Sequence, residues 1–414
     1  MMATEGPFLA AIIARLADPK FNLAAYGVAF AFALLVEAPV IMIMSASTAL
    51  VEDATSFRKL RNFTYALNAS VTAAMMVMLV PSFFSTLMKG VLGLPDQVTD
   101  LTYVALWMLL PWPGAIGYRR FYQGLLIRDG ATRLVAAGTV LRLTTMAGTG
   151  IVLYSTLAPP GAYVGAAALS VGVTVEAMAS RWMARNSVRK ILATTTYEGG
   201  AALGYGRVAR FYYPLALTSL IGLALQPMLT FFMGRAPSPI ESLAVFPVVH
   251  ALSFIFRAMG LSYQEVVIAL MGRRYEHIGQ LGRFAANLGL ASSVGLGLVA
   301  LTPLAWFWFN TVSGLSMDLA RFAIVPTMIL VPLPFLSVIL SYQRGILVVA
   351  QLTRPITWAT VIEVTLVAMV FPVLAWGFGW VGVTAAVTAF LVGRLAGILF
   401  LVEPCRRAVV SYGM

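Results

Sequence analysis

The amino-acid sequence predicts an all-α polytopic membrane protein built from two parallel six-helix repeats. Of its 414 residues, 60% are hydrophobic and 11% are charged, and the mean hydropathy is +0.87. A soluble protein has too little interior to bury so much apolar surface. Apolar runs long enough to cross a bilayer recur from end to end. The two halves of the chain also match when the residue numbers are shifted by 220 or 221.

Eleven apolar segments are long enough to span a membrane, which takes about 20 helical residues for a hydrocarbon core of about 30 Å. They are 23–51, 63–83, 99–121, 133–157, 161–182, 210–233, 241–270, 284–310, 321–347, 355–378 and 380–404. The shorter segment 7–16 cannot cross. The 21 prolines and 35 glycines predict kinked, closely packed helices.

The internal repeat explains the short segment. Matching residues at the two shifts are Arg15 and Arg235, Pro19 and Pro239, Pro111 and Pro332, Pro113 and Pro334, and Gly124 and Gly345. On this alignment the counterpart of segment 210–233 in the first half would lie largely before residue 1. Segment 7–16 is therefore expected to be a truncated first helix, leaving 11 full spans plus a stub, unless the true start lies upstream of Met1. Six crossings per repeat return the chain to its starting side, which predicts parallel repeats.

The longest polar stretch separates the halves. We expect an N-lobe at 1–190 (the stub of helix 1 to helix 6), a cytoplasmic linker at 191–209 and a C-lobe at 210–414 (helices 7 to 12).

Basic residues gather at one set of predicted helix ends, in groups around Arg58, Arg119, Arg185, Arg344 and Arg406. The positive-inside rule makes these ends and the C-terminus cytoplasmic, in a multi-pass protein of the plasma (inner) membrane. The net charge of +12 is then a topology signal that also favours anionic lipid headgroups. We expect membrane lipid as a partner, no nucleic acid, and a monomer.

Six ionisable residues lie well inside apolar segments, where a charge is costly and usually functional. They are Glu37, Arg142, Glu176, Arg257, Glu363 and Arg394. The repeat reverses their sign: Glu37 matches Arg257 and Arg142 matches Glu363. A third pairing, Glu176 with Arg394, is approximate, because it needs a shift of 217 and leaves one residue of offset.

These charges predict a substrate-binding or gating site, with two interpretations of their partners. Glu37 and Arg257 could meet across a cleft between the lobes, or each charge could pair within its own lobe and stabilise helix packing. The arginines stay charged and offer forked donors, which favours a small, anionic or zwitterionic substrate. The glutamates are candidate proton carriers.

Prolines predict breaks in several helices. Pro39 lies two residues after Glu37, and Pro111/Pro113 and Pro332/Pro334 are matched in the two halves. Each should interrupt a helix within the membrane and serve either as a hinge or as a static kink.

Enzyme signatures are missing from the sequence. It has no nucleotide-binding G-x-x-x-x-G-K-[ST] loop, no H-E-x-x-H and no Cys/His cluster, and its one cysteine is Cys405. We expect no enzyme, no metal site and no cofactor, with H⁺ or Na⁺ as possible coupling ions.

Two local patterns resemble the multidrug/oligosaccharidyl-lipid/polysaccharide (MOP) exporter superfamily, which includes the MATE transporters. They are Arg15–Pro19 (RLADP) followed by LAAYG at 23–27, and Arg120–Arg128 (RFYQGLLIR) followed by Thr132-Arg133. The nearest branch is the progressive ankylosis-like one. The resemblance implies a two-lobed exporter that works by rocking-bundle alternating access, driven by an ion gradient.

The chain departs from the best-known MATE pattern, because segments 210–233 and 321–347 contain no acidic residue at the places where coupling carboxylates are expected. The leading hypothesis is therefore a secondary active transporter, an exporter or antiporter, for an organic anion or amphipathic solute. The alternatives are a flippase for a lipid-linked glycan precursor, cation-coupled multidrug efflux, and a non-transporting membrane scaffold.

Overall fold

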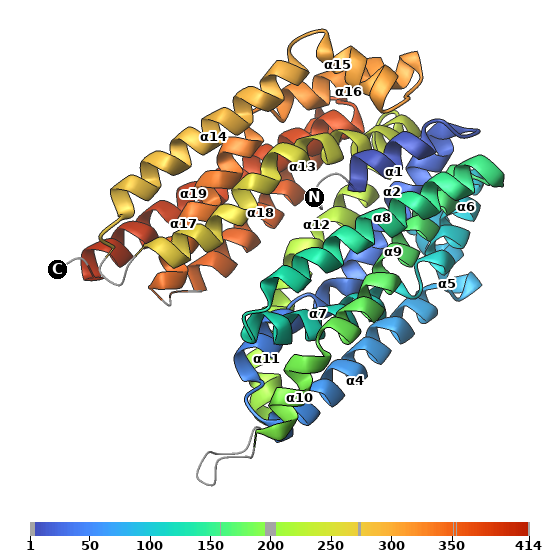
Figure 1. The fold of residues 1–414 in the computed structure, drawn as a ribbon. Coiled ribbons are helices and arrows are strands. Elements are labelled where there is room, and N and C mark those ends of the chain that lie inside the picture. The colour runs from blue at the N-terminus through green and yellow to red at the C-terminus, as the bar shows by residue number, and fades with distance from the viewer. Residues whose placement is uncertain are drawn as a thin grey trace. The chain divides into compact units, whose positions relative to one another are not determined.

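The computed structural model of the chain describes residues 5–157, 159–194, 204–271, 275–350, 352 and 354–412, without the side chains of 49, 214, 215, 218, 262, 265, 269, 411 and 412. Every element in these ranges is a helix (Figure 1). The predicted all-α class is confirmed. The middle of the predicted linker, 195–203, lies outside the described residues.

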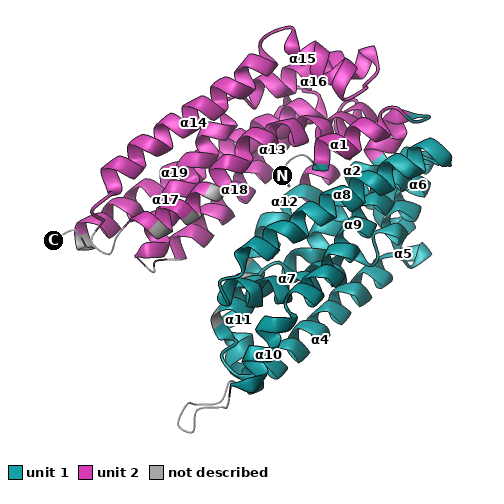
Figure 2. Ribbon diagram, viewed as in Figure 1, with its two compact units in different colours: residues 1–5, 16–18, 25–227 teal, residues 6–15, 19–24, 228–414 magenta. Residues whose placement is uncertain are grey.

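The chain divides into two compact units (Figure 2). Unit 1 comprises residues 1–5, 16–18 and 25–227, and unit 2 comprises residues 6–15, 19–24 and 228–414. The short helix α1 (Glu5–Ile13) lies mostly in unit 2, whereas α11 (Tyr205–Leu223) lies in unit 1. The lobe boundaries at 190 and 210 follow the sequence repeat, not these packing units, and stay a prediction.

The further helices of unit 1 run in chain order through a long bundle. They are α2 (Pro19–Glu37, which begins in unit 2), η2 (Ala38–Val40), α3 (Ile43–Leu50), α4 (Ala54–Met78), α5 (Pro81–Ser85), η3 (Thr86–Val91), α6 (Asp96–Met108), α7 (Trp112–Arg128), α8 (Thr132–Thr156), α9 (Gly161–Met183) and α10 (Arg185–Ala193).

Unit 2 contains a corresponding series. Its helices are α12 (Leu225–Gly234, which begins in unit 1), α13 (Pro239–Leu270), α14 (Ile278–Ala300), α15 (Leu304–Trp306), η4 (Phe307–Val312), α16 (Met317–Ile329), α17 (Leu333–Val349), α18 (Arg354–Pro372), η5 (Val373–Gly377) and α19 (Gly382–Tyr412).

The helix boundaries in the two units are related by the same shift in residue number as the sequence repeat. Adding 221 to the bounds of α6, α7 and the π-helix η3 gives the bounds of α16, α17 and the π-helix η4. The helices α2 and α13 also begin alike: Asp18 and Ser238 have left-handed backbone, with φ of 48° and 53°, and each precedes a proline at the first helical position.

Helix α9 begins at Gly161 and α19 at Gly382, again at a shift of 221. This corrects the alignment at a shift of 217: Glu176 corresponds to Gly397, and Arg394 to Val173. The match at a shift of 217 does not agree with these helix starts.

Close helix contacts also recur in both units, but in one of them the small and the large residue are exchanged between the two partners. A Cβ on Gly117 of α7 would lie 3.1 Å from Val40, and one on Gly260 of α13 would lie 2.9 Å from Val338 of α17. The repeat places Val338 at the position of Gly117 and Gly260 at that of Val40. Glycine and valine have therefore changed sides between the units.

Seven helical stretches of the described chain are long and apolar enough to cross a membrane, or up to nine if two bent pairs each count as one span. The pair α16 and α17 is bent by 42°. All eleven predicted segments are helical. Segment 99–121 is divided between α6 and α7, and segment 210–233 between α11 and α12, where the side chains of 214, 215 and 218 are not described. The count over the described residues does not test these two segments as spans, and the predicted number of eleven stays a prediction.

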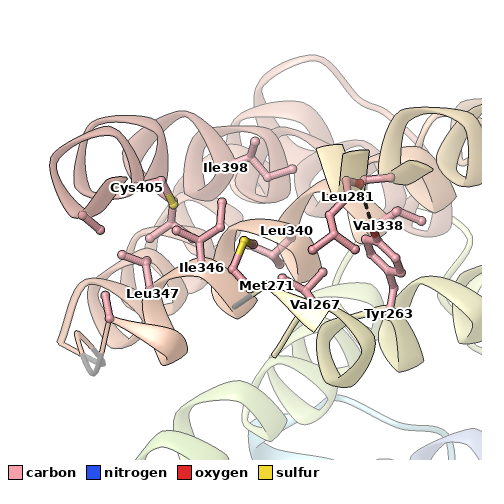
Figure 3. Close-up of a cluster of buried hydrophobic side chains, with 14 of the residues drawn as sticks. Tyr263, Val267, Met271, Leu281, Val338, Leu340, Ile346, Leu347, Ile398 and Cys405 are labelled. Carbon is pink, nitrogen blue, oxygen red and sulfur yellow. Dashed lines mark hydrogen bonds between the residues drawn. The ribbon is translucent and has the colours of Figure 1, made fainter. Parts of the chain in front are cut away.

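Each unit has its own apolar core. In unit 2 it includes Tyr263, Val267, Leu281 and Cys405, and the hydroxyl of Tyr263 donates to the carbonyl oxygen of Leu281 at 2.7 Å (Figure 3). In unit 1 the core gathers α3, α4 and α7 around side chains such as Phe121. Long α-helices with dry side-chain packing give each unit a rigid frame for buried polar groups.

Candidate functional site

A buried charge cluster in unit 1 centres on Glu176 of α9. Its side chain is fully buried and forms an ion pair with Arg119 of α7. One turn further along α7, Nε2 of Gln123 donates to Oε1 of Glu176 at 3.1 Å. From α8, Nε of Arg142 lies 3.4 Å from Oε2 of the same carboxylate. Gly138 of α8 leaves room for Glu176, since an added Cβ would lie 3.6 Å from it.

The short helix α1 completes this cluster. Its first residue, Glu5, forms a second ion pair with Arg142, and Arg142 is also buried. Two of the predicted site residues, Arg142 and Glu176, are therefore brought together by the packing of α8 against α9, which lie side by side in Figure 1. Burying ions is costly, and mutual pairing with further hydrogen bonds offsets that cost.

Glu37 occupies a separate position in unit 1, at the C-terminus of α2. It is buried, and its carboxylate accepts a hydrogen bond from the indole N–H of Trp112. Trp112 is the first residue of α7 and directly follows Pro111. The interruption at Pro111 therefore sets where α7 begins and, with it, the position of the Trp112 indole.

Unit 2 holds an ion pair of reversed polarity. Glu363 of α18 accepts from Arg394 of α19, whose Nε and Nη2 lie 3.0 and 2.8 Å from Oε1. In unit 1 the position equivalent to Glu363 is occupied by Arg142 on α8, and the acid, Glu176, lies on α9. Since Arg394 corresponds to Val173, the unit 2 base sits three residues, or about one turn, before the position of Glu176.

Arg257 of α13 has a different environment. Its Nε donates to the hydroxyl of Ser337 at 3.2 Å, and its guanidinium carbon lies 5.3 Å from the ring centre of Phe390. Arg394 approaches the same ring at 5.1 Å. Arg257 is 6% exposed, and its Nη1 has no hydrogen-bond partner in the part of the chain that the structure describes.

The predicted partners of the six charges can now be compared with the structure. Four of them, Arg142, Glu176, Glu363 and Arg394, pair within their own unit, as the second interpretation holds. Glu37 lies in unit 1 and Arg257 in unit 2, and each has the partners described above inside that unit. A meeting of Glu37 with Arg257 across a cleft stays a prediction.

All the predicted proline breaks coincide with interruptions of helix. Pro39 lies in the 3₁₀ turn η2 between α2 and α3, and its carbonyl oxygen accepts from the hydroxyl of Tyr212. Pro111 and Pro332 are the residues that precede α7 and α17, with Pro113 and Pro334 in the first turns. The hinge role of these residues stays a proposal.

Sequence reasoning missed several members of the clusters. Arg119 was grouped with the basic residues at helix ends, and that interpretation is wrong, because the side chain is 2% exposed and binds Glu176. Its spacing of four residues from Gln123 was the available signal, since such residues share one helix face. Glu5, Phe390 and Ser337 carried no signal beyond their residue type.

No group of three or more His, Cys, Asp or Glu residues that could hold a metal ion occurs among the described residues. The clusters consist of guanidinium groups, which stay charged and bind anions, and of carboxylates, which bind cations or protons.

Neither a family model nor a curated protein matches the sequence. Solved structures do match. An inward-facing multidrug resistance MATE family transporter of the MOP superfamily superposes with a TM-score of 0.76 at 15% identity, over 99% of this chain and 95% of that one. The lipid II flippase MurJ, in an inward closed conformation, gives 0.75 at 14% identity, over 99% and 88%. The multidrug transporter DinF-BH, in complex with R6G, gives 0.71 at 12% identity, over 99% and 93%.

These likenesses extend over almost the full length of both partners and agree with the repeat, the apolar helices and the resemblance found in the sequence. At such low identity they establish architecture alone. The chain is a multi-pass helical membrane protein with the fold that MATE transporters of the MOP superfamily share with the lipid II flippase MurJ.

Proposed function

We propose that this protein is a secondary transporter that moves an organic anion across the membrane by alternating access of its two repeats. The fold supports transport, and the observation that supports an anionic substrate is the environment of Arg257. A buried guanidinium keeps its charge under ordinary conditions, and its five donors match carboxylate and phosphate oxygens. Its Nη1, which carries two N–H groups, has no hydrogen-bond partner among the described residues and can donate to a ligand oxygen.

The balance of buried charge supports the same assignment. Among the described side chains, the buried ionisable groups of unit 1 are Glu37, Arg119, Arg142 and Glu176, which cancel. Those of unit 2 are Arg257, Glu363 and Arg394, which leave one positive charge over. A surplus cation in a low-dielectric interior is stabilised by an anion that arrives from outside.

The other predicted residues take roles around this centre. Arg394 and Glu363 hold the Phe390 side of the site, and Glu37 is the candidate partner of Arg257 when no substrate is bound. Protonation of Glu37 or Glu363 would couple transport to H⁺, with Na⁺ as the other candidate ion. Pro39, Pro111, Pro113, Pro332 and Pro334 would serve as bending points.

The test is uptake of radiolabelled citrate or an organic phosphate into liposomes that contain the purified protein. Arg257→Gln removes charge-assisted hydrogen bonds, each worth about 1.5–3 kcal/mol, so uptake should fall roughly 10- to 100-fold. Because no carboxylate loses its partner, the thermal midpoint should hardly change. The matched control is Arg283→Gln on α14, an exposed arginine whose loss should leave uptake intact.

Unchanged uptake in Arg257→Gln would refute the proposed site. The likeness to MurJ favours one other candidate, a flippase for a lipid-linked precursor. In that case Arg257→Gln should abolish translocation of a fluorescent lipid-linked pyrophosphate while the soluble anions are not carried by the wild-type protein either. Transport of cationic solutes alone, insensitive to Arg257→Gln, would favour multidrug efflux instead.

A further inference from the structure

A groove runs along unit 1 between α7 and α9. It has a volume of about 480 Å³ and is lined by Gly114, Ala115, Tyr118, Thr174, Ala177 and Met178, with Arg181 as the remaining lining residue. The small side chains of α7 leave the space open. This volume is in the range that holds one small organic ligand, roughly 300–1,000 Å³.

The groove lies beside exposed apolar side chains of a helix that is able to span the membrane. Met178 and Trp182 of α9 are 67% and 63% exposed, and α9 is long and apolar enough to cross the bilayer. Large apolar side chains exposed on such a helix contact lipid chains, which are as apolar as they are. The ligand that reaches this groove most readily is therefore a lipid chain.

One residue of the lining is charged. Arg181 lies in the last turn of α9, and its guanidinium carbon lies 5.2 Å above the ring of Tyr122, a contact that orients the side chain. Helix α10 follows at once and brings Arg185 and Arg189, both exposed. These three arginines have no carboxylate partner within the described part of the chain, whereas Lys190 is paired with Asp129.

We propose that this groove binds an anionic phospholipid, with one acyl chain between α7 and α9 and the phosphate on Arg181. An apolar channel that ends at a cation matches an amphipathic anion. A soluble anion would gain nothing from the apolar lining, and a neutral lipid would gain nothing from the arginine. Basic residues near a membrane surface each contribute about 1 kcal/mol to binding of anionic lipid.

Unit 2 supports the assignment by contrast. At the repeat positions of Gly114, Ala177 and Arg181 it carries Phe335, Ile398 and Val402. Larger apolar side chains replace the small ones, and the cation is lost. The repeat thus keeps neither the small lining residues nor the cation, so the features that would bind this lipid are particular to unit 1.

The experiment measures the thermal midpoint of the purified full chain in detergent, titrated with phosphatidylglycerol, phosphatidylcholine of the same chains, or inorganic phosphate. A ligand that binds the folded state raises the midpoint. We expect phosphatidylglycerol to stabilise the protein at lower concentration than phosphatidylcholine, and inorganic phosphate to have no effect. In Arg181→Gln the half-saturating concentration of phosphatidylglycerol should rise about fivefold, and that of phosphatidylcholine should stay the same.

Two further variants keep the test sharp. Ala115→Leu, the residue that unit 2 carries as Leu336, fills the groove and should weaken both lipids. Arg133→Gln, an exposed arginine at the start of α8 outside the groove, should change neither. The proposal is overturned if Arg181→Gln keeps the wild-type preference, if Arg133→Gln loses it equally, or if inorganic phosphate alone stabilises the wild-type protein as strongly.

Discussion

The two units contain corresponding helices but differ in how their buried charged side chains are paired. Unit 1 surrounds one carboxylate, Glu176, with Arg119, Gln123 and Arg142, and adds Glu5 on the far side of Arg142. Among the described residues of unit 2, the buried ion pair is Glu363 with Arg394, and Arg257 contacts a serine and an aromatic ring.

The difference separates two uses of an ion inside a membrane protein. A group whose partners are all internal stabilises one arrangement of helices, and removing any member leaves a charge without compensation. Arg119 and Arg142 each have an Nε without a hydrogen-bond partner as well, but both bind Glu176, whereas Arg257 has no carboxylate partner among the described residues. Removing Arg257 therefore leaves no buried carboxylate unpaired and is expected to affect ligand binding more than folding. Unit 1 is therefore expected to act as the structural half and unit 2 as the half that recognises the substrate.

The strongest way to break this comparison is Glu176→Leu. The substitution leaves Arg119 and Arg142 buried without their shared carboxylate, so unfolding should become easier by about 3–5 kcal/mol. The free energy of unfolding in denaturant measures the effect.

The matched control is Glu403→Gln in α19, which breaks the half-exposed pairs with Arg406 and Arg407 and should cost at most about 1 kcal/mol. If both glutamates cost the same, the cluster does not stabilise unit 1 and the comparison fails.

A smaller effect should separate the equivalent glycines Gly124 and Gly345. A Cβ at Gly124 would lie 2.5 Å from the backbone oxygen of Met44, which cannot move alone, as well as 1.8 Å from the hydroxyl of Ser47. At Gly345 the contacts under 3.0 Å are to the side chain of Val267. Overpacking of this kind costs about 1–3 kcal/mol.

Gly124→Ala should therefore lower the thermal midpoint more than Gly345→Ala does. Alanine regains up to about 1 kcal/mol of helix propensity at either site, so the difference between the two variants is the informative quantity. Equal midpoints would show that the two helix contacts are equally adaptable.

The smallest effect concerns the loop after α7, where Asp129 binds Lys190 and Ser187 of α10. Hydrogen bonds from these two side chains hold the pKa of Asp129 below its ordinary value of 3.8. A lowered carboxyl pKa stabilises the folded state at pH values above the ordinary pKa, and that stabilisation is lost as the pH falls through the lowered pKa. Unit 2 has Ala350 at the matching position.

Asp129→Asn should thus lower the midpoint slightly at pH 6, by the roughly 0.2–1 kcal/mol of an exposed pair. The gap between wild type and variant should begin to narrow near pH 4 and close as the pH falls through the lowered pKa of Asp129. Lys190→Gln should give the same loss at pH 6. A gap that stays the same size from pH 6 to pH 2 would mean that the ion pair is not its cause.

Much of the fold could be predicted because its causes are local in the sequence. Apolar runs mark the helices, prolines mark their interruptions, and the shift that aligns the two halves of the sequence appears again in the helix boundaries. Composition does not show where a run is interrupted: 99–121 has the composition of one span, yet its helix breaks before Pro111 into α6 and α7.

The candidate site was predicted in its residues and only partly in its contacts. Charges such as Arg142 and Glu363 stand out against an apolar background. Their partners depend on the rotation of neighbouring helices, which hydropathy does not encode. Arg119 was missed for this reason: beside Arg120 it has the composition of a helix end, and only the packing of α7 against α9 places it on Glu176.

The exchange of glycine and valine between Gly117 with Val40 and Gly260 with Val338 has a consequence for grafting parts of one half into the other. Transplanting α17 in place of α7 would set valine against valine, and the reverse graft would leave a void between two glycines. Moving both partners together preserves the complementarity. The transferable module of this architecture is thus the interlocked couple of helices, and the individual helix is not interchangeable.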